Sequence, residues 1–356
     1  RGETVGAKLT SDNRVRGVMF TGSTEVASLL QRNIATRLDA QGRPTPLIAE
    51  TGGMNAMIVD SSALTEQVVV DVLASAFDSA GQRCSALRVL CLQDDVADHT
   101  LKMLRGAMAE CRMGNPGRLT TDIGPVIDAE AKANIENHIQ AMRAKGRPVF
   151  QAVRDNSEDA REWRSGTFVP PTLIELASFD ELKKEVFGPV LHVVRYNRNN
   201  LNELVEQINA SGYGLTLGVH TRIDETIAQV TGSAKVGNLY VNRNMVGAVV
   251  SVQPFGGEGL SGTGPKAGGP LYLYRLLANR PENALGVTLA RQDAEYPVDA
   301  QLKTVLTQPL DALIKWADNR PELRAIAQQY GELAQAGTQR LLPGPTGERN
   351  TRSEEH

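Results

Sequence analysis

The sequence has few cysteines, few aromatic residues and no marked excess of charge, and each shortage argues against a class of protein. Of the 356 residues, three are cysteine and 4% are aromatic. Because Cys84, Cys91 and Cys111 form no CxxC pair, a disulfide framework is not expected, and a reducing, cytoplasmic setting is favoured. The formal net charge of −3, without a basic stripe, argues against nucleic acid as the main partner.

Long apolar runs are also absent, because no uninterrupted stretch approaches the ~20 residues that a membrane helix needs. The chain opens with charged residues and no Met, so no signal peptide is predicted and we expect a piece of a larger protein. The five histidines are scattered without metal-ligand spacing, and no metal site is expected. The lack of a G-x-S-x-G elbow argues against a serine hydrolase.

Short apolar runs alternate with helical periodicity along the first third of the chain. Strands are predicted at residues 16–22, 47–50, 56–60 and 88–92. Helices are predicted at residues 65–78, 95–111 and 23–37, the last with a Ser or Thr N-cap. This alternation favours an α/β fold with a largely parallel sheet.

The rest of the chain is expected to continue the pattern and then to lose it. Further helices are predicted at residues 128–144 and 201–211, and further strands at 148–153, 187–194, 215–221 and 237–242. Glycine and proline crowd residues 254–270, which predicts an irregular loop. After about residue 290, short helices broken at Pro309, Pro321 and Pro343 suggest a connecting arm.

Cys84 lies at a polar corner between a predicted helix and a predicted strand. Gly81 gives the backbone freedom there, and Arg83 is a neighbouring cation. A nucleophilic thiol must be reachable and partly ionised, and its ordinary pKa of about 8.5 falls near cations or helix N-termini. Cys84 is therefore a candidate nucleophile, whereas Cys91 in an apolar strand and Cys111 on a helix are interpreted as structural.

Glu50 ends a predicted strand and is followed at once by Thr51-Gly52-Gly53. A carboxylate in such a place is most often a solvated turn residue. Held in a drier site, its pKa would rise and it could take a proton from water as a general base. Because the carboxyl ends of strands are where α/β sheets bind ligands, Glu50 is the second candidate for chemistry.

Two glycine-rich patterns do not qualify as nucleotide motifs. The sequence GEGLSG at 257–262 matches G-x-G-x-x-G, yet Pro254 precedes it and Pro265 follows it, so no helix is expected to begin there. Pro265 also separates Gly264 from Lys266 and spoils a phosphate-binding P-loop. The loop is interpreted as a rigid backbone cradle whose N–H groups could bind an anion such as a carboxylate.

Five segments together resemble the aldehyde dehydrogenase superfamily in their order and spacing. They are FTGSTEVA (20–27), ETGG (50–53), GQRC (81–84), EVFGP (185–189) and PFGG (254–257). The resemblance covers about residues 5–285 and is greatest to the bacterial bifunctional proline utilization A family. It implies oxidation of L-glutamate γ-semialdehyde, which is in equilibrium with 1-pyrroline-5-carboxylate, to L-glutamate with NAD⁺.

The resemblance assigns roles to the two candidates and to the cofactor contacts. Cys84 would attack the aldehyde, and Glu50 would activate the water that hydrolyses the resulting thioester. Gly22 and Ser23 match the helix start beside the NAD pyrophosphate, while Glu185 and Phe187 match the residues at the nicotinamide ribose and ring. Taken singly, Ser23 could be only an N-cap, Glu185 a solvated charge and Phe187 core packing.

The same resemblance places the substrate's α-carboxylate against a small set of residues. The matching residues are Ser85, Phe255, Gly257, Gly259 and Ser261. The implied fold is an aldehyde-dehydrogenase-like α/β fold, with a parallel-sheet catalytic domain, a partial Rossmann-like NAD-binding domain and a helical C-terminal arm.

The sequence is expected to divide into four parts. We predict the end of an NAD-binding domain over residues 1–50, a thiol-bearing catalytic domain over 51–245, the substrate loop and its return over 246–290, and a helical arm over 291–356. In the resembled family, an Asn of the oxyanion hole and a Lys at the adenosine ribose lie further upstream. Because losing one oxyanion donor slows acyl transfer by roughly 10²- to 10³-fold, the isolated piece is expected to be inactive.

The resemblance also implies partners beyond the aldehyde substrate. An FAD-dependent proline dehydrogenase module, and in some members a DNA-binding module, would lie upstream in the same chain. A homo-oligomer is expected, as is a cytoplasmic location, with peripheral association of some full-length members with the inner membrane. Two alternatives stay open: a different aldehyde dehydrogenase, and a non-catalytic module of the same fold, against which the pairing of Cys84 with Glu50 argues.

Overall fold

Three central strands are buried at every position, as expected for a parallel sheet covered on both faces. They are β3 (Ala56–Val59), β4 (Val89–Gln93) and β9 (Thr216–His220). These details come from a computed structural model. It describes residues 2–39, 42, 44–153, 166–248, 252–269, 271–277, 300–318, 320, 324, 327–328, 339–341 and 349–351. The chain divides into two compact units, residues 1–263 and 264–356.

A seven-stranded sheet forms the larger core of the first unit, with the strand order β10-β9-β3-β4-β7-β6-β5. The other four strands are β5 (Val149–Gln151), β6 (Thr172–Glu175), β7 (Val190–Tyr196) and β10 (Asn238–Val241). All neighbouring pairs are parallel except β5 with β6 at one edge. This arrangement confirms the predicted α/β fold with a largely parallel sheet.

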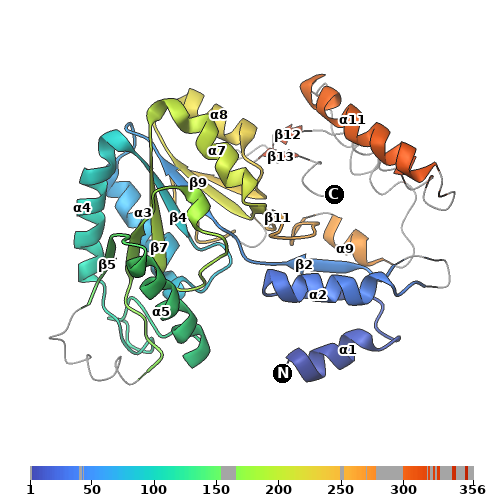
Figure 1. The fold of residues 1–356 in the computed structure, drawn as a ribbon, viewed down its shortest axis with the longest axis horizontal. Coiled ribbons are helices and arrows are strands. Elements are labelled where there is room, and N and C mark those ends of the chain that lie inside the picture. Colours follow the sequence, from blue (N-terminus) through green and yellow to red (C-terminus); the bar gives the residue numbers. More distant parts are fainter. Residues whose placement is uncertain are drawn as a thin grey trace. The chain divides into compact units, whose positions relative to one another are not determined.

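Helices cover both faces of this sheet (Figure 1). On one side lie α3 (Thr65–Phe77) and α4 (Asp94–Glu110), and on the other lie α5 (Ala129–Ala144), α7 (Leu201–Ala210) and α8 (Asp224–Ser233). Short 3₁₀ helices are η2 (Asp78–Gly81), η3 (Phe179–Glu181) and η4 (Arg198–Asn200). The apolar faces of these elements share one continuous core.

A second, smaller sheet pairs β1 (Val18–Thr21) with β2 (Leu47–Glu50) in parallel. Helix α2 (Thr24–Ala35) connects the two strands and packs on them through its own small core, which is formed by Val18, Ala27, Ile34, Leu47 and Ala49. The chain begins with a π-helical turn, η1 (Gly2–Gly6), and with α1 (Ala7–Ser11). Two-residue strands, β8 (Tyr213–Gly214) and β11 (Glu258–Gly259), form an antiparallel pair.

The second unit contains two described helices and one strand pair. These are α9 (Leu271–Leu276), α11 (Ala300–Ala317), β12 (Gln339–Leu341) and β13 (Arg349–Thr351). The expected break at Pro309 is wrong, because α11 runs through it. Pro309 is exposed, so the carbonyl that loses its helical partner there can bond water. The expected breaks at Pro321 and Pro343 lie outside the described residues.

Most other predicted elements agree with the structure to within one to three residues at each end. Strand β6 was not predicted, because no strand was expected between the predicted strands at residues 148–153 and 187–194. The division into four parts stays a prediction.

Candidate functional site

Three connecting segments bring reactive side chains to one edge of the seven-stranded sheet. Residues 84–88 lead into β4, residues 51–55 lead into β3, and residues 185–189 lead into β7. Since β3, β4 and β7 are parallel neighbours, their amino-terminal ends lie at the same edge. Open α/β sheets ordinarily bind ligands at the opposite, carboxyl-terminal edge. Glu50, which ends β2 of the smaller sheet, follows that rule, and so do Gly22 and Ser23, which come directly after β1.

The thiol is carried by a turn with unusual backbone angles. Ser79, Ala80 and Gly81 all have positive φ, at 56°, 54° and 64°. A Cβ on Gly81 would lie 2.2 Å from the carbonyl oxygen of Gly188, so a side chain there is excluded as well as strained. The turn leaves the Cys84 side chain half-buried, between solvent and the sheet edge.

Burial raises the pKa of the Cys84 thiol, and the negative charges of Glu185 and then Glu50 raise it further. The thiol therefore rests in its protonated form at neutral pH and gains nucleophilicity when a proton is removed. Both carboxylates thus act on the same sulfur. Cys91 and Cys111 differ, as predicted: burial raises the pKa of Cys91 to about 12, and Cys111 donates to the Ala107 carbonyl within its own helix.

Glu185 lies in a tight, largely protein-lined position. Its Oε1 accepts from Nε and Nη2 of Arg88 at 3.1 and 2.9 Å. A Cβ on Gly52 would lie 1.6 Å from Glu185 Oε2, so only glycine fits beneath that carboxylate. Burial raises the pKa of Glu185, whereas Arg88 and the backbone N–H of Gly53 act in the opposite direction.

Phe187 stays 45% exposed although one face of its ring is covered. The guanidinium carbon of the fully buried Arg88 lies 5.1 Å from the ring centroid. A cation over one face fixes the ring, and the remaining exposed surface can receive a planar group. The alternative interpretation, that Phe187 only packs in the core, does not fit this exposed ring.

Glu50 is held against the glycine-rich loop. Its Oε2 accepts from the backbone N–H of Gly257 at 3.0 Å, and its carbonyl accepts from Gly22 at 3.1 Å. Next to Glu50, the backbone N–H of Thr51 donates to the Ser261 carbonyl at 2.8 Å. The loop therefore contacts Glu50, the candidate base, directly. This loop was predicted to bind an anion through its backbone N–H groups, and one of them, that of Gly257, donates to the Glu50 carboxylate.

Gly22 and Ser23 stand where α2 begins, as predicted. Ser23 is the N-cap, and its Oγ accepts from the Val26 N–H at 3.3 Å. The other amides of the first turn remain available to a ligand. Tyr213, on β8, hydrogen-bonds Thr24. Burial and then the nearby charge of Glu185 raise the pKa of its hydroxyl. The helix start thus lies close to Glu185.

The residues predicted for the substrate carboxylate differ in exposure. Ser85 and Ser261 are buried, and Ser261 Oγ accepts from the Gly214 N–H at 3.1 Å. Phe255 is half-buried, whereas Gly259 is exposed and takes a positive φ of 61° in β11. Their role in substrate binding stays a prediction.

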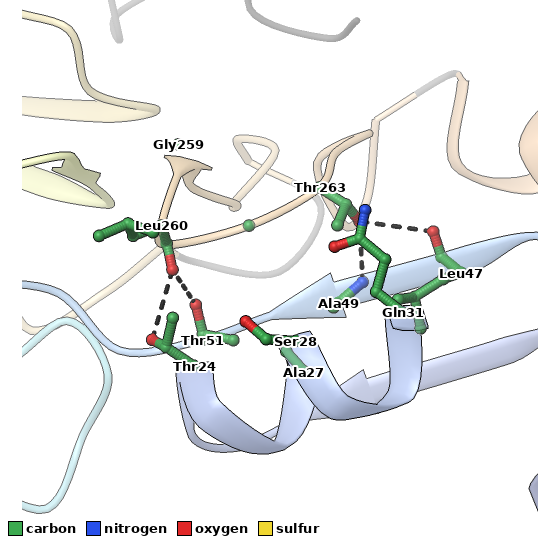
Figure 2. Close-up of a pocket in the computed structure, with 11 residues that line it drawn as sticks. Thr24, Ala27, Ser28, Gln31, Leu47, Ala49, Thr51, Gly259, Leu260 and Thr263 are labelled. Carbon is green, nitrogen blue, oxygen red and sulfur yellow. Dashed lines mark hydrogen bonds between the residues drawn. The ribbon is translucent and has the colours of Figure 1, made fainter. Parts of the chain in front are cut away.

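A cavity of about 110 Å³ lies between α2, β2 and the loop segment 259–263. Figure 2 shows Leu260, whose carbonyl accepts from Thr24 and Thr51, and Thr263, whose hydroxyl accepts from the Ala49 N–H and donates to the Leu47 carbonyl. Because side chains alternate along a strand, Ala49 and Thr51 face this cavity while Glu50 points to the other side. No charged side chain lines it, and it is separate from the thiol.

Two buried polar residues at this edge were missed by sequence reasoning. Asn55 donates from Nδ2 to the carbonyls of Cys84 and Ala86 at 2.6 and 2.9 Å, and its Oδ1 accepts from Thr216 N–H at 3.2 Å. Arg88 binds Glu185 and the thiol turn. The signal available beforehand was a polar side chain beside an apolar strand, at the points where β3 and β4 begin.

Within the described ranges, no group of three or more His, Cys, Asp or Glu side chains is placed to hold a metal ion. The described helices also include none with the length and apolar character needed to cross a membrane.

Comparisons with known proteins relate this geometry to one family. Residues 1–278 match the sequence model described as "Aldehyde dehydrogenase family". A bifunctional protein PutA from Escherichia coli (strain K12) is 90% identical over 351 residues, which are 99% of this chain and 27% of that protein. A 1-pyrroline-5-carboxylate dehydrogenase from Bacillus cereus (strain B4264) is 35% identical over 274 residues, covering 76% of this chain and 52% of that protein.

Solved structures give the same relationship. A crystal structure of a bifunctional proline utilization A (PutA) protein aligns with a TM-score of 0.71 at 52% identity, covering 77% of this chain and 27% of that one. A 1-pyrroline-5-carboxylate dehydrogenase from Thermus with bound NAD aligns with a TM-score of 0.69 at 34% identity, covering 77% of this chain and 52% of that one. The chain thus spans about a quarter of the bifunctional relatives it matches.

Proposed function

The chain belongs to the aldehyde dehydrogenase family, and from that premise we propose that it carries the thiol site for NAD-dependent oxidation of L-glutamate γ-semialdehyde to L-glutamate. The relatives named for 1-pyrroline-5-carboxylate, the cyclic form of this aldehyde, support that substrate. The chain spans only part of these relatives, so the activity is proposed for the full-length protein that contains it.

One observation carries the proposal: the charges of Glu50 and Glu185 both act on the half-buried Cys84 thiol. Glu50 comes from the small sheet and Cys84 from the edge of the large one, yet the charge of Glu50 raises the pKa of the thiol, in addition to burial and the charge of Glu185. A scaffold without chemistry has no need of a reachable thiol between two carboxylates. A nucleophile with an adjacent base is the arrangement that covalent acyl chemistry requires.

The residues divide the reaction between them. The Cys84 sulfur forms a bond to the aldehyde carbon while the thiol proton passes to the aldehyde oxygen, and loss of a hydride from that carbon and of the proton from that oxygen leaves a thioester on the enzyme. Glu50 then takes a proton from a water molecule whose oxygen attacks the thioester carbon. The carbon–sulfur bond breaks, the carboxylate product leaves and the thiol is regenerated.

The residues present fit NAD, which when bound supplies the acceptor for the hydride. The exposed face of Phe187 suits a planar ring, and the carboxylate oxygens of Glu185 suit sugar hydroxyls. The start of α2, with Gly22 and Ser23, suits a pyrophosphate. The NAD-bound relative from Thermus supports the same cofactor.

We propose that Ser85 and the loop from Phe255 to Ser261, with Gly257 and Gly259, hold the substrate's α-carboxylate. The exposed, positive-φ backbone of Gly259 and the half-buried ring of Phe255 leave a surface on that loop that a small anion can approach. We further propose a proline-oxidising module in the full-length protein, which its bifunctional relatives support, with FAD as the cofactor of that module. A homo-oligomer is proposed as well, and three free thiols favour the cytoplasm.

Replacing the nucleophile tests the proposal directly. In the full-length protein, Cys84→Ala should abolish NADH production from the semialdehyde, measured by absorbance with saturating NAD⁺. The matched control is Cys91→Ala, because Cys91 is buried in β4 and its side chain lies away from the sheet edge. Turnover that persists in Cys84→Ala, or that is lost equally in both variants, would contradict the proposed role of Cys84.

A further inference from the structure

One buried side chain touches several parts of the candidate site at once. Arg88 is fully buried and directly precedes β4. Besides the two bonds to Glu185 Oε1, its Nη1 donates to the carbonyls of Gly81 and Gly188 at 2.7 and 3.3 Å. Its Nη2 donates to the carbonyl of Arg83 at 3.0 Å.

These five bonds use every N–H that a guanidinium possesses. Two go to the carboxylate of Glu185, two go to the turn that carries Cys84, and one goes to the segment that carries Phe187. The side chain also lies over the Phe187 ring. A lysine has only three donors on a single nitrogen, so it cannot reproduce this set.

The Glu185 carboxylate has little freedom once Arg88 is in place. Gly52 closes its other side so tightly that a Cβ there would overlap Oε2. Burial alone favours the neutral acid, and the cation of Arg88 is the largest influence that favours the charged form. Arg88 thus determines both where this carboxylate lies and how readily it is ionised.

We propose that Arg88 is a positioning residue that sets the ionised Glu185 carboxylate and the Cys84 turn in a fixed relation to each other. It does not touch the substrate in this arrangement, because its whole surface is enclosed by protein. Its effect on the cofactor runs through Glu185 and Phe187, and the inference therefore rests on the proposed function of those two residues.

A double-mutant cycle in the full-length protein tests the coupling. The variants are Arg88→Met, Glu185→Gln and both together, and the readout is the Kd for NAD⁺ by equilibrium titration. Each single change should weaken NAD⁺ binding by roughly tenfold or more, since a bond to a charged group is lost. The double variant should be no weaker than Arg88→Met alone. Effects that multiply, or Arg88→Met binding within twofold of the parent, would overturn the proposal.

The pH dependence of binding separates positioning from general loss of structure. In Arg88→Met, the pKa of Glu185 should rise further, so NAD⁺ affinity should improve as the pH increases from 6 to 9 more steeply than in the parent. The double variant has no carboxylate at this position and should lose that extra dependence. An identical pH profile in all three variants would contradict a role through Glu185.

The chain offers a matched control in a second arginine–glutamate–phenylalanine set. Arg105 on α4 pairs with Glu175 at 2.5 Å and lies 6.0 Å from the Phe150 ring centroid, among elements remote from the thiol turn. Arg105→Met should keep NAD⁺ affinity within about twofold of the parent, since surface ion pairs contribute little. An effect as large as that of Arg88→Met would argue against a specific role.

If Arg88→Met does not fold, Arg88→Lys decides the question. Lysine keeps the charge beside Glu185 but leaves carbonyls of the thiol turn without partners. NAD⁺ affinity should stay within about fivefold of the parent, while kcat for the semialdehyde should fall at least tenfold. A variant equal to the parent in both would overturn the proposal. A parent protein that neither binds NAD⁺ nor oxidises the semialdehyde would instead contradict the proposed function.

Discussion

The seven-stranded sheet and the two-stranded sheet contribute differently to the same site. In the large sheet, β3, β4 and β9 are buried at every position, and helices cover both faces. In the small sheet, β1 is buried at only one of its four positions, and Met19 on it is 61% exposed. The thiol therefore stands at the edge of a large core, whereas Glu50 ends β2, which is buried at three of its four positions but belongs to a two-stranded sheet with a small core of its own.

The weaker support of Glu50 is compensated by backbone bonds from the glycine-rich loop. Glu50 and Gly262 form an antiparallel bridge, Thr51 donates to the Ser261 carbonyl, and Thr263 donates to the Ala49 carbonyl. The loop thus pairs with β2 on the side that β1 leaves open. A base held by backbone pairing rather than by a large core can be displaced by local changes that leave the large sheet intact.

The largest expected effect comes from truncating one buried side chain in or beside each sheet in turn, which tests whether the two sheets differ in packing. Leu90→Ala in β4 should lower the free energy of unfolding of the full-length protein's domain by about 2–5 kcal/mol. Ile34→Ala in α2 should fall at or below the low end of that range, because its cluster is small and close to solvent. Urea denaturation measures both values, and equal losses in both variants would contradict the difference in support.

A smaller effect is expected from displacing the thiol turn alone. Gly81→Ala places a Cβ against the Gly188 carbonyl, so kcat/KM for the semialdehyde should fall by about 10²-fold. Gly146, which also has positive φ at 76°, has no atom within 4 Å of the same position. Gly146→Ala should destabilise the fold by about 1–2 kcal/mol through backbone strain and leave kcat/KM unchanged. Equal activity of the two variants would show that the turn is not critical.

Acid should destabilise the part of the chain that forms the seven-stranded sheet first, since residues 2–50, which include the two-stranded sheet, contain no histidine. Burial lowers the pKa of His192 to about 3 from its ordinary 6.5, and His138, which bonds it at 2.9 Å, is lowered as well. Between those two pKa values the unfolded chain binds a proton that folded His192 refuses. Stability should therefore fall as the pH drops from about 6.5 towards 3, by up to ~1.4 kcal/mol per unit from this group.

His192→Asn removes the titrating ring and keeps a donor near the Arg88 carbonyl, which His192 Nδ1 contacts at 3.1 Å. The slope of unfolding free energy against pH below 6.5 should become shallower in this variant, as measured by urea denaturation at each pH. An unchanged slope would show that His192 does not control acid stability.

The smallest expected effect is on the reactivity of the Cys84 thiol, which compares the influence of Glu185 with that of Glu50. Glu185→Gln and Glu50→Gln each remove a charge that raises the pKa of Cys84. Alkylation of Cys84 by iodoacetamide should become a few-fold faster at neutral pH in both variants, and more so in Glu185→Gln, whose charge has the larger influence. A reversed order, or no change in either variant, would contradict the placement of the two carboxylates.

The sequence was sufficient for features that depend on neighbouring residues. The helix start at Ser23, the strand ending in Glu50 and the flexible corner before Cys84 all follow from local pattern and are found in the structure. It could not show that Arg88 and Asn55 would be buried beside the thiol, because their partners come from distant segments. Strand β6 and the continuation of α11 through Pro309 also depend on context that a local pattern does not contain.

The central claim is that Cys84 forms a thioester that Glu50 helps water to hydrolyse. The most direct measurement is the pre-steady-state production of NADH by the Glu50→Gln variant of the full-length protein, mixed rapidly with the semialdehyde and NAD⁺. We predict a burst of about one NADH per active site, followed by a steady rate far below that of the parent. Loss of the burst itself, with the hydride step slowed as much as turnover, would contradict the assignment of Glu50 as the base for hydrolysis.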